Sequence, residues 1–176
     1  MSDSDQTTAN GQQATADSPR PLVHVYCDGA CSPNPGVGGW GAVLIAPDHG
    51  AYRRELSGAE AGTTNNRMEL TGAIMALRAL KWPSRVVLHT DSQYLRNAFE
   101  HGWLRKWTAN GWRTASKQPV LNVDLWQKLL QLDATHEIAW TWVRGHADNP
   151  ENNRCDALAV AAREELAARL KAAASV

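Results

Sequence analysis

The segment that most constrains the fold is residues 85–90, Arg-Val-Val-Leu-His-Thr, a short apolar run that follows a helical pattern. A continuous run of apolar and β-branched residues of this length is typical of a strand that is buried on both faces. The preceding helix is indicated by apolar residues at helical spacing, namely Leu70, Ile74, Leu77 and Leu80. A strand that follows a helical crossover usually runs parallel to an earlier strand. We therefore expect residues 85–90 to pair in parallel with a strand near the start of the chain.

The remaining elements complete a mixed sheet. Residues 22–27, 38–47 and 51–56 are strand candidates joined by Gly-rich turns, which predicts an antiparallel meander. Helical stretches are indicated at 93–99, 103–109 and 123–132, and residues 136–143 alternate as a strand. Asn149 and Pro150 open a long last helix, because Pro suits the first helical position. The sum predicts an α/β fold with a mixed five-stranded sheet and helices against it.

Length and charge exclude several classes of protein. The chain has 176 residues, which suits a single domain, and its 18 Lys and Arg residues balance 18 Asp and Glu residues. Bulk charge therefore does not mark an obligate nucleic-acid or membrane binder, and a polyanion site would have to be local. Residues 1–20 are polar and are expected to form a disordered tail, with the domain over 21–172.

The cellular setting follows from what the sequence lacks. It has neither an apolar run long enough to span a membrane nor the features of a signal peptide, so no membrane association is expected. The three cysteines form no Cys-x-x-Cys pair and fit a reducing compartment better than a disulfide framework. We expect a cytoplasmic protein, with a monomer as the default state.

Four acidic residues occupy positions where chemistry could arise. Asp28 and Asp91 end strand candidates, Glu69 lies one turn inside the first helix, and Asp156 lies in the first turns of the last helix. Each has an ordinary structural explanation as a cap or as a partner of a helix dipole. Together, however, they could converge at the carboxyl edge of the sheet. Repulsion between them would be relieved by a hard cation such as Mg²⁺ or Mn²⁺, and two such ions can clamp a phosphoryl displacement.

Two further features could serve a polyanion substrate. His146, in the loop Gly-His-Ala-Asp-Asn-Pro, is either an exposed loop histidine or a proton shuttle beside a metal site. The stretch 101–117 contains basic residues and no acidic residue, interleaved with Trp103, Trp107 and Trp112. These tryptophans either pack on the core or form a surface that follows a phosphate backbone, and we favour binding. The polar loops 31–36 and 63–67 could either contact hydroxyl and base-edge groups in a shallow groove or form turns and a helix cap, and from the residues alone we favour turns.

At these motifs the sequence resembles bacterial type 1 ribonuclease H. The resemblance rests on YCDGACSPNPGVGGWG, TTNNRMEL, HTDSQY, NVDLW and WVRGHADNPENNRCDALA, in the family's order, and covers residues 22 to about 165. It implies a ribonuclease H-like sheet with helices on both sides. It also implies endonucleolytic hydrolysis of the RNA strand of RNA–DNA hybrids with Mg²⁺ or Mn²⁺, which leaves 5′-phosphate and 3′-hydroxyl ends.

The resemblance also assigns roles to individual residues. Asp28, Glu69, Asp91 and Asp156 would hold two metal ions, with Asp28 between them, and His146 would assist product release or proton transfer. The implied contacts with the minor groove and the RNA 2′-hydroxyls are Cys31, Asn34, Asn65, Asn66 and Gln93. Thr64 and Asn122 would form a pocket for a DNA phosphate. The stretch from Trp103 to Lys117, with Trp107 and Trp112, would form the handle along the DNA strand.

The sequence departs from the family in two places. Thr108, Ala109 and Asn110 replace the consecutive basic residues of strongly basic handles, which predicts weaker hybrid affinity. Gly62 stands where some members place an Arg beside the phosphate pocket.

Three rival functions remain open from the residues alone. Another nuclease of the same fold would share the acidic residues, a non-catalytic module would bind hybrids without cutting them, and a glycosidase would use two carboxylates without a metal.

Overall fold

The sheet of this computed structural model has the order β3-β2-β1-β4-β5, and the structure describes residues 20–50, 52–144 and 149–175. The strands are β1 (Leu22–Cys31), β2 (Gly36–Ala46), β3 (Tyr52–Thr63), β4 (Arg85–Thr90) and β5 (Glu137–Trp142). The helices are α1 (Asn65–Arg78), α2 (Gln93–Glu100), α3 (Trp103–Ala109), α4 (Val123–Thr135) and α5 (Pro150–Ala173). β1 pairs antiparallel with β2 and parallel with β4, and β4 pairs parallel with β5. The predicted mixed five-stranded sheet is therefore confirmed.

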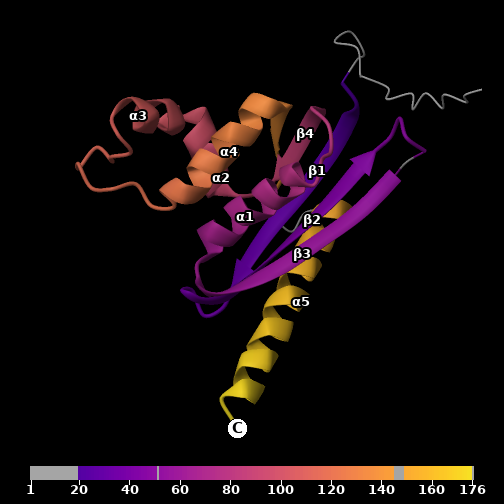
Figure 1. Ribbon diagram of the computed structural model, residues 1–176, viewed down its shortest axis with the longest axis vertical. Coiled ribbons are helices and arrows are strands. Elements are labelled where there is room, and N and C mark those ends of the chain that lie inside the picture. Colours follow the sequence, from indigo (N-terminus) through magenta and orange to yellow (C-terminus); the bar gives the residue numbers. More distant parts are fainter. Residues whose placement is uncertain (1–19, 51, 145–148, 176) are drawn as a thin grey trace, which may run out of the picture.

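Helices pack against both faces of the sheet, as expected (Figure 1). On one face, α1 lies so close to β1 that a Cβ at Gly72 would stand 3.3 Å from the carbonyl oxygen of Asp28. On the other face, α5 approaches β2 where Gly41 provides the space. The core under α1 and α4 includes Val25, Leu88 and the fully buried Trp126. None of the helices in the described part of the chain is long and apolar enough to cross a membrane.

Asp28 does not end its strand, which corrects the expectation from the sequence. β1 continues to Cys31 because Ala30 and Cys31 still pair with Gly39 and Gly38 of β2. Residues 22–27 alternate between buried and half-buried positions, so Asp28 shares a face with Tyr26 rather than with the buried Cys27. The turn after β1 is confined to residues 32–35 and includes cis peptide bonds before both prolines. The carboxylate is thus held by a paired strand.

Two boundaries also differ from the prediction. β3 was expected to end near residue 56 but extends to Thr63, paired with β2 over most of its length. It is an edge strand with mostly exposed side chains, so backbone pairing extends it without an apolar pattern. α1 ends at Arg78, with Ala79 as its C-cap, although the helical spacing of apolar residues predicted a helix that includes Leu80. The tail expected over residues 1–20 lies, except for Arg20, outside the described residues.

Candidate active site

The four predicted carboxylates line one cleft of about 460 Å³ at the end of the parallel strands. Its lining also includes Cys31, Asn65, Asn66 and Gln93, four of the residues predicted to contact substrate. The remaining lining residues are Gly29, Ala30, Tyr94 and Arg163. The structure therefore brings together residues from β1, α1, α2 and α5 and from the end of β4. His146 lies outside the described residues, so its role stays a prediction.

Asp28 lies at the centre of this charge cluster. Burial, followed by the negative charge of Asp91, raises its pKa from 3.8 to about 7, and Asp156 and Glu69 contribute further. The backbone N–H of Gly29 donates to Asp28 Oδ1 at 2.7 Å and partly opposes this rise in pKa. Asp28 is therefore a carboxylate whose ionisation is costly unless a cation is nearby.

Two neutral donors orient Glu69. Asn65 Nδ2 donates to Glu69 Oε1 at 3.3 Å, and the Ser92 hydroxyl donates to Glu69 Oε2. Burial raises the pKa of Glu69, while the Ser92 hydrogen bond acts in the opposite direction. Ser92 Oγ also accepts from the N–H of Leu95, so it caps α2. Sequence reasoning missed Ser92, although its place before a helix in HTDSQY signals a cap.

Asp91 has a partner on α5 that the sequence analysis also missed. Asn152 Nδ2 donates to Asp91 Oδ2 at 3.3 Å, and Asn152 is only 3% exposed. Asn149 caps α5 by accepting from the N–H groups of Glu151 and Asn152. Asn152 and Asp156 are four residues apart and so share a helix face. The spacing of Asn152 and Asp156 in the last helix is the only signal in the sequence that could have identified Asn152.

The two polar loops meet at the rim of the cleft. Asn65 Oδ1 accepts from the N–H of Cys31 at 3.0 Å, and Asn34 Oδ1 accepts from the N–H of Asn65 at 3.2 Å. The Cys31 thiol donates to the carbonyl oxygen of Pro33 at 3.2 Å. These bonds connect residues 31–34 to the start of α1. The contacts of Cys31, Asn34 and Asn65 with substrate stay predictions.

Thr64 and Asn122 are connected through Arg67. Thr64 caps α1 by accepting from the N–H of Arg67, and Arg67 Nη1 donates to Asn122 Oδ1 at 3.2 Å. Asp124 holds the guanidinium of Arg67 with two bonds of 3.1 Å. Tyr94 accepts from Asn122 Nδ2 at 3.2 Å. Sequence reasoning missed Arg67, which fixes the amide of the predicted phosphate pocket.

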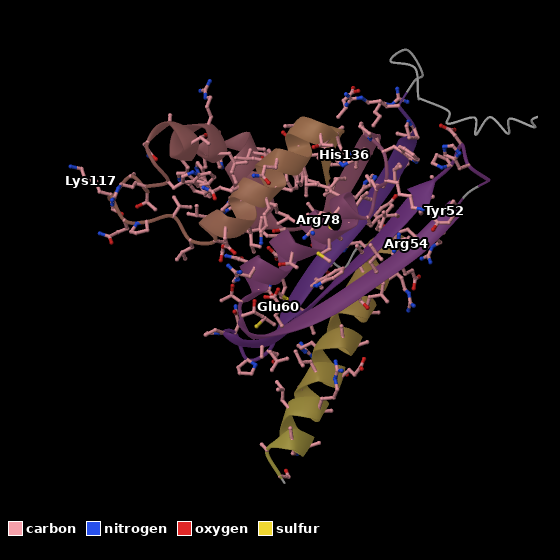
Figure 2. All side chains as sticks on the ribbon, in the orientation of Figure 1. Tyr52, Arg54, Glu60, Arg78, Lys117 and His136 are labelled. Atoms are coloured by element: carbon pink, nitrogen blue, oxygen red, sulfur yellow. The ribbon has the colours of Figure 1, made fainter. Side chains whose placement is uncertain are left out.

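The tryptophans of the predicted handle pack partly on the core. Trp103, Trp107 and Trp112 are partly buried against it, and the rings of Trp107 and Trp126 are 5.8 Å apart. This is the less favoured of the two alternatives, although all three tryptophans remain partly exposed. Lys117 lies at the outer end of the loop after α3, away from the sheet (Figure 2). Binding by this stretch stays a prediction.

The donor set of the cleft suits a hard divalent cation. Its charged donors are carboxylates, which Mg²⁺ and Mn²⁺ prefer over the Cys and His ligands of zinc. The negative charge of Asp91 adds to burial in raising the pKa of Asp28, and a bound cation would counteract both effects. Within the described ranges, no three carboxylate, imidazole or thiol groups lie close enough to form a ready-made metal site. A cation would therefore have to draw the carboxylates together.

A β3-β2-β1-β4-β5 sheet with helices on both faces and an acidic cleft at the ends of β1 and β4 defines a ribonuclease H-like protein. The sequence model of the family described as RNase H matches residues 20–164. The chain belongs to the ribonuclease H family.

Close relatives and a solved structure agree with this assignment. The ribonuclease H of Moorella thermoacetica is 63% identical over 140 residues, which cover 80% of this chain and 90% of that protein. The ribonuclease H of Symbiobacterium thermophilum is 59% identical, with coverage of 80% and 93%. The crystal structure of LC9-RNase H1, a type 1 RNase H with the type 2 active-site motif, superposes with a TM-score of 0.75 at 35% identity, covering 85% of this chain and 75% of that one.

Proposed function

We propose that this protein is an endonuclease that hydrolyses the RNA strand of RNA–DNA hybrids and leaves 5′-phosphate and 3′-hydroxyl ends. The observation that carries the proposal is the cleft in which four carboxylates lie beside Asn65, Asn66 and Gln93. Relatives up to 63% identical that are named Ribonuclease H support the same activity.

The proposal includes divalent cations, with Mg²⁺ as the cofactor, two ions per site and Mn²⁺ as a substitute. Asp28, Glu69, Asp91 and Asp156 would hold them, and bound cations would stabilise the charge on the attacking and leaving oxygens. Asn65 and Ser92 orient Glu69, and Asn152 orients Asp91, so three neutral donors set the geometry of two of the carboxylates. His146 would assist proton transfer or product release.

Selection of the RNA strand would come from the amides at the rim. Asn34, Asn65, Asn66 and Gln93 can donate to and accept from 2′-hydroxyls and base edges in a wide, shallow groove, and the Cys31 backbone shares their hydrogen-bond network. Thr64 and Asn122, held by Arg67, would bind a phosphate of the DNA strand, and the handle from Trp103 to Lys117 would follow that strand.

The decisive experiment is cleavage of an end-labelled RNA–DNA hybrid with Mg²⁺, beside single-stranded RNA, duplex RNA and duplex DNA, each repeated with a chelator. Chelator-sensitive cutting of the hybrid's RNA strand alone is expected, and Asp91→Asn should abolish it while preserving the fold by circular dichroism. Binding without cutting would establish the non-catalytic alternative. Cutting of duplex or branched DNA would assign another nuclease activity of this fold, and cutting that persists in chelator would contradict the metal proposal.

We further propose a monomer in the cytoplasm. The free cysteines Cys27, Cys31 and Cys155 support a reducing compartment. Light scattering coupled to size-exclusion chromatography should give the mass of one chain, 19.3 kDa.

A further inference from the structure

One cationic side chain, Arg163 of α5, lines the acidic cleft alongside the four carboxylates. Its side chain is only 20% exposed, although arginines on helices usually extend into water. Its one ion pair in the described part of the chain is with its neighbour Glu164, at 3.4 Å, and the Glu164 side chain is 67% exposed. Such an exposed pair contributes little. Arg163 therefore has no strong partner for a largely buried charge.

The packing of α5 on the sheet explains why Arg163 reaches the cleft. A Cβ at Gly39 of β2 would stand 2.1 Å from the carbonyl oxygen of Ala159 and 2.8 Å from the backbone nitrogen of Arg163. The glycine thus allows the helix backbone to lie directly on the strand. α5 crosses behind the sheet and continues past the edge at which β1 ends (Figure 1). Arg163 lines the same cleft as Gly29, Ala30 and Cys31, which form the end of β1.

The position of Arg163 relative to Asp156 defines where it could act. The two residues are seven apart, which is about two helical turns, so they share a face and lie about 10 Å apart along the axis. Arg163 forms no ion pair with any of the four carboxylates of the cleft, all of which lie in the described part of the chain. A guanidinium binds phosphate oxygens with two parallel hydrogen bonds and retains its charge at all relevant pH values. Its natural partner in this setting is a phosphate that enters the cleft with the substrate.

We propose that Arg163 is a substrate-binding residue whose guanidinium binds a phosphate of the cleaved RNA strand, a few nucleotides from the scissile bond. The inference rests on the proposed function, because it requires that the hybrid's RNA strand lies in this cleft. We assign the contact to the RNA strand because Arg163 lines the same cleft as the four carboxylates. The predicted contacts with the DNA strand, which are the handle and the Asn122 pocket, lie along α3 and α4 instead.

The test compares Arg163→Gln and Arg163→Lys with Arg169→Gln in the full-length protein. Arg169 is a matched control, since it lies on the same helix with a side chain that is 70% exposed. Hybrid affinity is measured by fluorescence anisotropy in chelator at several salt concentrations, and kcat and KM are measured with Mg²⁺. R163Q should weaken binding about tenfold at low salt and make the slope of log affinity against log salt shallower by roughly 0.7 to 0.9. The hybrid affinity of R163K should lie between those of the wild type and R163Q, and that of R169Q should stay within about twofold of the wild type. The R163Q substitution should raise KM more than it changes kcat.

A second measurement locates the contact. A series of hybrids, each with one neutral methylphosphonate at a different position of either strand, is bound to the wild type and to R163Q. At one RNA-strand position the methylphosphonate should weaken binding by the wild type but should not weaken binding by R163Q any further. If the wild type and R163Q differ equally on every analogue, or differ only at DNA-strand positions, the inference is wrong. It is also wrong if R163Q alters Mn²⁺ binding measured by calorimetry but leaves hybrid affinity unchanged, since Arg163 would then only neutralise the carboxylates. If the wild type does not cut the hybrid, the proposed function fails instead.

Discussion

Replacing Asp28 by Asn should stabilise the metal-free protein above neutral pH. Burial and Asp91 raise the pKa of Asp28 from 3.8 to about 7. Each pKa unit corresponds to about 1.4 kcal/mol, so full ionisation in the folded state costs up to about 4 kcal/mol. Between about pH 4 and 7 the folded state holds a proton that the unfolded state releases, so the free energy of unfolding falls as pH rises through this window. Above pH 7 the full cost is present.

The assay is urea unfolding in chelator from pH 4 to 9, followed by tryptophan fluorescence, for which the fully buried Trp126 is one reporter. Asp28→Asn retains the oxygen that accepts from Gly29 but cannot ionise. Its free energy of unfolding should match that of the wild type near pH 4 and exceed it by up to about 4 kcal/mol above pH 7. Asp48→Asn, at an exposed turn, should show no such divergence. Parallel curves for D28N and the wild type, or a less stable D28N at pH 8, would refute the reasoning.

Three other substitutions test how the cleft is built. Ser92→Ala removes both the cap of α2 and a donor to Glu69. It should lower the free energy of unfolding, measured by thermal melts, by about 1 kcal/mol, and it should also reduce kcat. A destabilised variant with an unchanged kcat would show that the hydrogen bond to Glu69 does not matter for catalysis. Asn152→Ala should weaken Mn²⁺ binding in calorimetry, because Asp91 loses a donor, and unaltered affinity would show that the bond is unimportant. Gly41→Ala places a Cβ 2.2 Å from a backbone oxygen of α5. Urea melts should therefore show a free energy of unfolding that is lower by at least roughly 1 to 3 kcal/mol.

The acidic cleft could be anticipated because its residues follow features that a sequence displays. Asp91 follows a continuous apolar run, and Asp156 follows a Pro that begins a helix, so the sequence pattern alone predicts both elements. Asp28 was placed at a strand end because Gly29 and the prolines after it resemble turn residues. In the structure Gly29 remains within β1, where a Cβ would meet the backbone of Glu69 at 2.4 Å. That glycine serves the close approach of a helix, and a local pattern cannot distinguish this use from a turn.

The partners of the carboxylates could not be predicted, because they depend on contacts between distant segments. Ser92 and Glu69 are 23 residues apart, and Asn152 and Asp91 are 61 apart. Arg163 escaped notice for the same reason, since nothing near it in the sequence indicates that Gly39 allows its helix to reach the cleft.

Two residues that cap helices also help to position the carboxylates of the cleft, so the same residue must satisfy both the helix and the cleft. Ser92 uses one hydroxyl to accept from the backbone of α2 and to donate to Glu69. Asn149 fixes the first turn of α5, which places Asn152 against Asp91 and, one turn later, Asp156 in the cleft. A cap ordinarily tolerates exchange among Ser, Thr, Asp and Asn. At Ser92 an Asp would still cap the helix, but it could not donate to Glu69 and would add a like charge beside it. The hydrogen bond to Glu69 therefore restricts position 92 to fewer residue types than helix capping alone would allow.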